Sequence, residues 1–173
     1  GHYGVGKTNL ALNLVRDLRE RYPRVTLIDL DIVNPYFRAS ESVEFLHDID
    51  VDVLGPVFAG SNLDTPSLSP GIENTLAIAG PEHAVVVDVG GDPDGARALA
   101  RFNSTIKNRA HRLLYVINQQ RLQTQDIEET LELLSDIETT SKLSASGVIA
   151  NTHLQAETTA ETIVAAIPYA IAV

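Results

Sequence analysis

The chain opens with the octet Gly1-His2-Tyr3-Gly4-Val5-Gly6-Lys7-Thr8, here called the opening loop, which has the form G-x-x-x-x-G-K-[ST]. Its glycines let the backbone turn its N–H groups inward, and the loop runs into the positive end of a predicted helix. Such a loop binds phosphate. We expect Lys7 to reach the β- and γ-phosphates of a nucleotide and the Thr8 hydroxyl to ligate Mg²⁺. Because the pattern requires a strand before the loop, we expect one upstream of Gly1.

The rest of the chain alternates short apolar runs with helical periodicity, which predicts a parallel sheet built from βα units. Strands are expected at residues 25–30, 51–54, 83–89, 112–118, 147–150 and 168–173. Helices are expected directly after the opening loop, at residues 72–79, through residues 96–108, from residue 127 to residue 137, and after a capping box of Thr158 and Glu161. We therefore predict a single α/β domain over residues 1–173, doubly wound, with a mainly parallel sheet and helices on both faces.

Composition and charge exclude several classes of function. Of the 173 residues, 44% are hydrophobic and 21% are charged, which is ordinary for a folded domain. Acidic residues outnumber basic ones 23 to 13, so we expect no nucleic-acid partner. The absence of cysteine excludes disulfides, thiolate metal sites and a cysteine nucleophile. No apolar run approaches the roughly 20 residues of a membrane span, and we expect a soluble, cytoplasmic protein without one.

Three acidic residues end two of the predicted strands. Asp29 and Asp31 close the strand that begins at residue 25, and Asp88 closes the apolar run at residues 84–87. Doubly wound sheets bind their ligands at the carboxyl ends of strands. We therefore expect Asp88 to hold Mg²⁺, directly or through water, and Asp29 or Asp31 to orient an attacking water. The candidate metal ligands are Thr8, Asp29 and Asp88.

These motifs resemble those of the MinD/ParA and nitrogenase iron protein family of P-loop ATPases, the CobQ/CobB/MinD/ParA nucleotide-binding domains. The opening loop is similar to the deviant Walker A motif of that family, residues 28–31 to its switch I, and residues 88–91 to its switch II. The segment Gly147–Asn151 looks like the strand whose last residue hydrogen-bonds adenine. The G-H-Y-G start and residues 29–38 resemble an uncharacterised bacterial branch. The resemblance implies ATP and Mg²⁺ as cofactors.

One position departs from the family pattern. The family's signature lysine, which reaches the nucleotide of a partner subunit, is replaced here by His2. A nucleotide-dependent homodimer therefore needs another cation, for which Arg38, Arg97 and Arg101 are candidates. The candidate nucleotide-binding residues are Gly1, His2, Gly4, Val5, Gly6, Lys7, Thr8, Asn9, Asn118 and Asn151, and the candidate catalytic residues are Lys7, Asp29 and Asp31.

The resulting prediction is a Mg-dependent ATP-binding protein that hydrolyses ATP slowly and acts as a nucleotide-dependent switch toward an unknown partner. Its switch loops, residues 29–38 and 88–94, would change shape when the γ-phosphate is lost. Two alternatives use the same motifs. One is an ATP-dependent ligase or transferase acting on a small carboxylate, similar to dethiobiotin synthetase or cobyrinate amidase, with a substrate pocket formed by residues 34–38 and the proline-rich loop at residues 55–71. The other is a nucleotide-gated binding protein without useful turnover.

Overall fold

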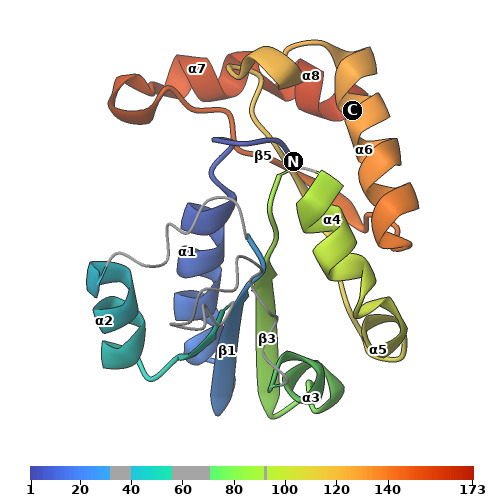
Figure 1. The fold of residues 1–173 in the computed structure, drawn as a ribbon. Coiled ribbons are helices and arrows are strands. Elements are labelled where there is room, and N and C mark those ends of the chain that lie inside the picture. The colour runs from blue at the N-terminus through green and yellow to red at the C-terminus, as the bar shows by residue number, and fades with distance from the viewer. Residues whose placement is uncertain (32–39, 56–70, 92) are drawn as a thin grey trace, which may run out of the picture.

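A computed structural model describes residues 1–31, 40–55, 71–91 and 93–173 (Figure 1). The predicted switch I beyond Asp31, including Arg38, lies outside the described residues, as do nearly all of the predicted long loop and Asp92.

Parallel strands form the centre of the fold. β1 (Arg24–Asp29) lies between β2 (Asp52–Leu54) and β3 (His83–Asp88), while β4 (Leu114–Ile117) pairs with β5 (Gly147–Ala150). Each of these strand pairs is parallel. The register of β1 and β3 places Asp29 opposite Asp88, so two predicted site carboxylates end neighbouring strands at one edge of the sheet.

Helices pack on both faces of the sheet formed by β2, β1 and β3 (Figure 1). On one face, Val25 and Leu27 of β1 pack with Ala11 and Val15 of α1 (Lys7–Arg19) and with Leu46 of α2 (Ser40–Asp48). These side chains are buried, which makes this face a continuous apolar core.

The opposite face of the same strand carries the second core. Ile28 packs with Ile72 of α3 (Gly71–Ala77), Leu99 of α4 (Pro93–Ala100) and Phe102, which precedes α5 (Asn103–Lys107). Because successive strand residues point to opposite faces, β1 is buried on both. The predicted doubly wound α/β class is confirmed.

A third core covers β4 and β5. Tyr115 and Ile117 of β4 pack with Tyr169 of α8 (Ile167–Ala172), and α6 (Ile127–Ser141) adds Leu134 and Ile137. α7 (Ala160–Ala165) precedes α8. Among the described residues, no helix is both long and apolar enough to cross a membrane.

The predicted strand at residues 168–173 is wrong, because α8 occupies these residues. A short apolar run does not by itself distinguish a strand from a helix. Pro168 stands in the first helical turn, where its missing N–H costs nothing. Tyr169 then points inward while Ile171 is 79% exposed, which is the pattern of a helix with one buried face.

Two helix boundaries also differ from prediction. The capping box is formed by Thr159 and Thr162, one residue beyond the predicted Thr158. The Thr158 hydroxyl instead donates to the Gln155 carbonyl, closing the turn before α7. The helix expected through residues 96–108 is interrupted between α4, which ends at Ala100, and α5, which begins at Asn103. Phe102 lies in this interruption, and its side chain packs in the second core.

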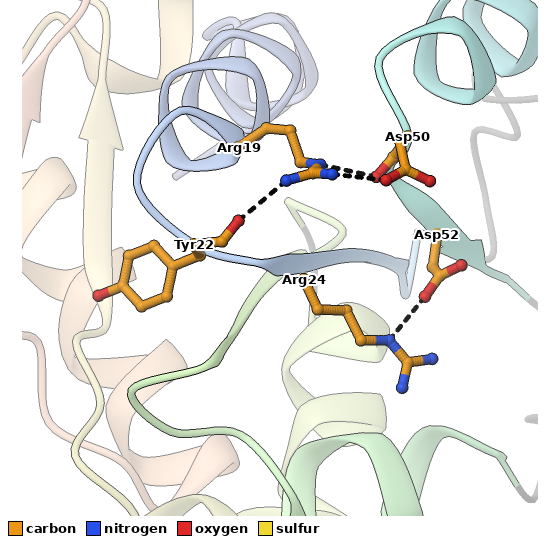
Figure 2. A network of polar contacts seen from close by, with 5 residues as sticks. All are labelled: Arg19, Tyr22, Arg24, Asp50 and Asp52. Atoms are coloured by element: carbon orange, nitrogen blue, oxygen red, sulfur yellow. Dashed lines mark hydrogen bonds and ion pairs between the residues drawn. The ribbon is translucent and has the colours of Figure 1, made fainter.

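Two arginines connect α1 and β1 to the segment that carries β2 (Figure 2). Arg19 donates to the Tyr22 carbonyl and pairs with Asp50 at 2.5 Å, while Arg24 pairs with Asp52 at 2.9 Å. Exposed ion pairs contribute only about 0–1 kcal/mol each. This network lies at the amino ends of the strands, away from the edge that carries Asp29 and Asp88.

Candidate functional site

The opening loop turns through two glycines with positive φ. Gly4 has a φ of 70° and Gly6, the residue before α1, a φ of 88°. A Cβ at Gly6 would also lie 2.4 Å from the Asn151 amide nitrogen, so the Asn151 side chain would have to move. The glycine spacing of the octet therefore has a direct structural reason.

The loop lies between the ends of β3 and β4. A Cβ at Gly1 would overlap the carbonyl oxygen of Val116 in β4, at 1.7 Å. On the other side, a Cβ at Gly91 would lie 2.7 Å from the His2 carbonyl carbon and 2.8 Å from the Gly1 oxygen. Only glycine fits these two positions without displacing backbone, so the loop and the turn after β3 are in close contact.

Lys7 folds back over this loop. Its ammonium donates to the His2 carbonyl at 2.9 Å and lies 6.0 Å from the centre of the Tyr3 ring. It also lies near Asp88, and its positive charge acts to lower the pKa of the Asp88 carboxyl. The ammonium thus stands between the loop backbone and the end of β3.

The Thr8 hydroxyl donates to the Asp88 carboxylate at 2.6 Å, which joins residues 80 positions apart. Asp88 is 4% exposed, and burial raises its pKa above the ordinary value. The hydrogen bond from Thr8 and the charge of Lys7 oppose this rise, while Asp31 adds to it. Burial therefore disfavours the charged form of a carboxylate that accepts a hydrogen bond from Thr8 and lies near the Lys7 charge.

The two remaining predicted carboxylates lie at the same edge. Asp29 is 5% exposed, and its Oδ1 accepts the backbone N–H of Asp31 at 2.8 Å. Asp31 is half-buried and close enough to Asp88 to affect its pKa. The structure thus brings together the opening loop, Asp29, Asp31 and Asp88. Across the described ranges, which stop at residue 31 and resume at residue 40, no group of three or more His, Asp or Glu side chains has a geometry that would hold a metal ion.

The asparagines occupy different settings. Asn151 donates through Nδ2 to the Val5 carbonyl at 2.7 Å, so the end of β5 touches the loop. Asn118 is fully buried, and its Oδ1 accepts the N–H groups of Gln120 and His153. Asn118 therefore connects the turns after β4 and β5. Asn9 is exposed on α1.

Neither described candidate for a substitute cation contacts the loop in the structure. Arg97 pairs with Asp94 on the exposed side of α4, and Arg101 is exposed after the end of that helix. The arginine that does contact the loop was not among the predicted residues. Arg121 donates through Nε to the Gly4 carbonyl at 3.1 Å. Because the two residues are 117 positions apart, no local motif announces this contact.

A search of curated proteins found no relative that matches the chain. The family model described as the CobQ/CobB/MinD/ParA nucleotide binding domain matches residues 3–169, nearly the whole chain. This span includes the glycine turns, Lys7, the strand-end carboxylates and Asn151. The chain belongs to the CobQ/CobB/MinD/ParA nucleotide-binding family.

Proposed function

We propose that this protein binds ATP with Mg²⁺, hydrolyses it slowly and acts as a nucleotide-dependent switch. The observation that carries the proposal is the contact between the Thr8 hydroxyl and the Asp88 carboxylate, with the Lys7 ammonium beside them. The family supports nucleotide binding, and this contact brings together groups that would meet a triphosphate and its metal.

The opening loop would hold the phosphates. Its inward N–H groups and the positive end of α1 favour an anion. Lys7 would exchange its present contact with the His2 carbonyl for the β- and γ-phosphates, and would stabilise the charge that develops during transfer.

Thr8 and Asp88 fit a magnesium ion. Mg²⁺ takes oxygen ligands, usually one or two carboxylates together with waters and substrate phosphates. The two oxygens already lie 2.6 Å apart, and Asp29 ends the neighbouring strand in register with Asp88. When bound, the ion would neutralise negative charge on the phosphoryl oxygens.

Hydrolysis also needs an oriented water. We assign this role to Asp29 or Asp31, which lie at the same strand edge as Asp88. Asp29 holds the turn through the Asp31 N–H, and Asp31 is the more exposed of the two. Both residues begin the segment expected to change shape with the γ-phosphate, and Gly91 belongs to the second such segment.

We further propose that residues 1–173 act as one nucleotide-binding domain completed by a strand before Gly1. No hydrogen-bonded ladder joins β3 to β4 among the described residues, and Gly1 lies between Val116 of β4 and the turn after β3. A parallel strand that leads into Gly1 would fit between these two edges.

We also propose that the switch assembles as an ATP-dependent homodimer.

The test is phosphate release from ATP and Mg²⁺ without any added metabolite, in the wild type, Thr8→Ser and Thr8→Ala. Serine keeps the hydroxyl, so we expect Thr8→Ser to retain most turnover and Thr8→Ala to lose it. Equal turnover in Thr8→Ala and the wild type would contradict the proposed metal site. Product formed only with an added carboxylate would favour the ligase alternative, and tight ATP binding without phosphate release would favour the nucleotide-gated binder.

A further inference from the structure

Arg121 places a permanent positive charge against the opening loop. Its Nε donates to the Gly4 carbonyl, and a Cβ at Gly4 would lie 3.4 Å from both Nε and Cζ of Arg121. The guanidinium therefore lies close beside Gly4, with Nε as the atom that bonds the loop. Its terminal nitrogens remain available for a ligand, since the contacts of the described residues use only Nε.

A buried hydrogen-bond network fixes the backbone of this arginine. The Arg121 N–H donates to the Asn118 carbonyl at 3.0 Å, and the Arg121 carbonyl accepts the N–H of Thr124 at 2.8 Å. Thr124 is fully buried, and its own carbonyl accepts the Tyr169 hydroxyl at 2.5 Å. The side chain thus starts from a rigid turn that α8 supports, which lowers the entropy lost when it meets a ligand.

Two further polar side chains flank the loop on the same side. Asn151 reaches the Val5 carbonyl, and His153 Nε2 lies 3.3 Å from the position of a Cβ at Gly6. His153 Nδ1 accepts the N–H of Gln155, so the neutral ring carries its proton on Nε2. Burial, followed by the charge of Arg121, lowers the pKa of His153 and favours this neutral donor.

These three residues come from the turns after β4 and β5, whereas Asp88 and Gly91 approach the loop from β3. If the triphosphate and its metal lie on the β3 side, the nucleoside must leave the loop toward β4 and β5. We propose that Arg121 is a nucleotide-binding residue whose planar guanidinium packs against the purine base. The proposal rests on the nucleotide binding proposed above and adds the residue that contacts the base.

The guanidinium group explains why an arginine suits contact with a purine base. Arginine stacks on aromatic rings through its flat face and stays charged at any physiological pH, so it can hold a base and still bond the Gly4 carbonyl through Nε. A lysine at this position keeps the charge but offers no flat face.

The test compares ATP with inorganic tripolyphosphate, which has the phosphates but no base, as ligands of the wild type, Arg121→Ala and Arg121→Lys. Calorimetry should show ATP binding weakened about 5- to 30-fold in both variants and tripolyphosphate binding changed less than about twofold. Arg21→Ala is the matched control, since Arg21 is exposed beyond the end of α1.

Equal weakening toward ATP and tripolyphosphate would overturn the proposal, because Arg121 would then act on the phosphates or on the loop itself. Unchanged ATP binding in Arg121→Lys would also overturn it, and this variant decides the matter if Arg121→Ala does not fold. Failure of the wild type to bind ATP would refute the proposed function instead, so the two failures are distinguishable.

Discussion

Replacing Gly91 by alanine tests how closely the opening loop approaches the turn after β3. The new Cβ would lie 2.7 Å from the His2 carbonyl carbon and 2.8 Å from the Gly1 oxygen, whereas ordinary contacts begin at 3.4 Å. Backbone must therefore move by about 0.7 Å, by the difference between these distances. Overpacking of this kind costs about 1–3 kcal/mol, and each kcal/mol lowers the Tm of a domain this size by about 2–4 °C.

We expect Gly91→Ala to lower the Tm by about 2–12 °C and to weaken ATP binding, since the displaced backbone belongs to the opening loop, which we propose to hold the phosphates. Thermal unfolding and an ATP titration measure the two effects. Gly80→Ala is the matched control, because a Cβ there meets nothing within 4 Å and Gly80 does not have a positive φ. If Gly91→Ala matched Gly80→Ala in both measurements, the inferred contact between loop and turn would be refuted.

Four further predictions concern three single residues and the proposed assembly. Asp88→Asn should stabilise the apo protein by about 0.5–2 kcal/mol, because burial disfavours the Asp88 charge, yet abolish Mg-dependent turnover; a less stable variant would contradict this sign. Asn151→Ala should reduce the preference for ATP over GTP in competition binding, and an unchanged ratio would remove Asn151 from base recognition. Burial, and secondarily the charge of Arg24, lowers the pKa of His83, so the unfolded chain binds a proton near pH 6.5 and the folded chain only at lower pH. Denaturant melts should therefore show the free energy of unfolding falling as the pH drops below about 6.5. His83→Gln should flatten that fall, and an identical pH profile would exclude His83 as its cause. A non-hydrolysable ATP analogue should double the mass in light scattering, whereas a persistent monomer would argue against the ATP-dependent dimer.

The sequence predicted the central fold because short apolar runs alternate with segments of helical periodicity. β1 carries the apolar residues Val25, Leu27 and Ile28, and β3 carries the apolar run at residues 84–87, which is typical of parallel strands covered by helices. The predicted strand at residues 168–173 is wrong because a short apolar run is compatible with either element, whereas Pro168 favours a first helical turn. What decides that segment is its packing on β4 and β5 through Tyr169, which is a tertiary effect.

The sequence likewise predicted some residues of the candidate site and missed others. The opening loop is a contiguous motif, and Asp29 and Asp88 follow strands whose carboxyl ends meet, so both were accessible to pattern reasoning. The roles assigned to them remain proposals. Arg121 could not be found in this way, because it meets Gly4 only after the turns beyond β4 and β5 are in place.

The most direct test of the account is the thermal shift that MgATP produces in the wild type, Lys7→Ala and Lys107→Ala, the last an exposed lysine on α5. At 100 times its Kd, ATP should stabilise the wild type and Lys107→Ala by about 2.7 kcal/mol, or about 5–10 °C. Loss of the charge-assisted phosphate contacts should weaken binding roughly 100-fold in Lys7→Ala and leave a shift below about 2 °C. A Lys7→Ala shift equal to that of the wild type would contradict the claim that this loop holds the phosphates.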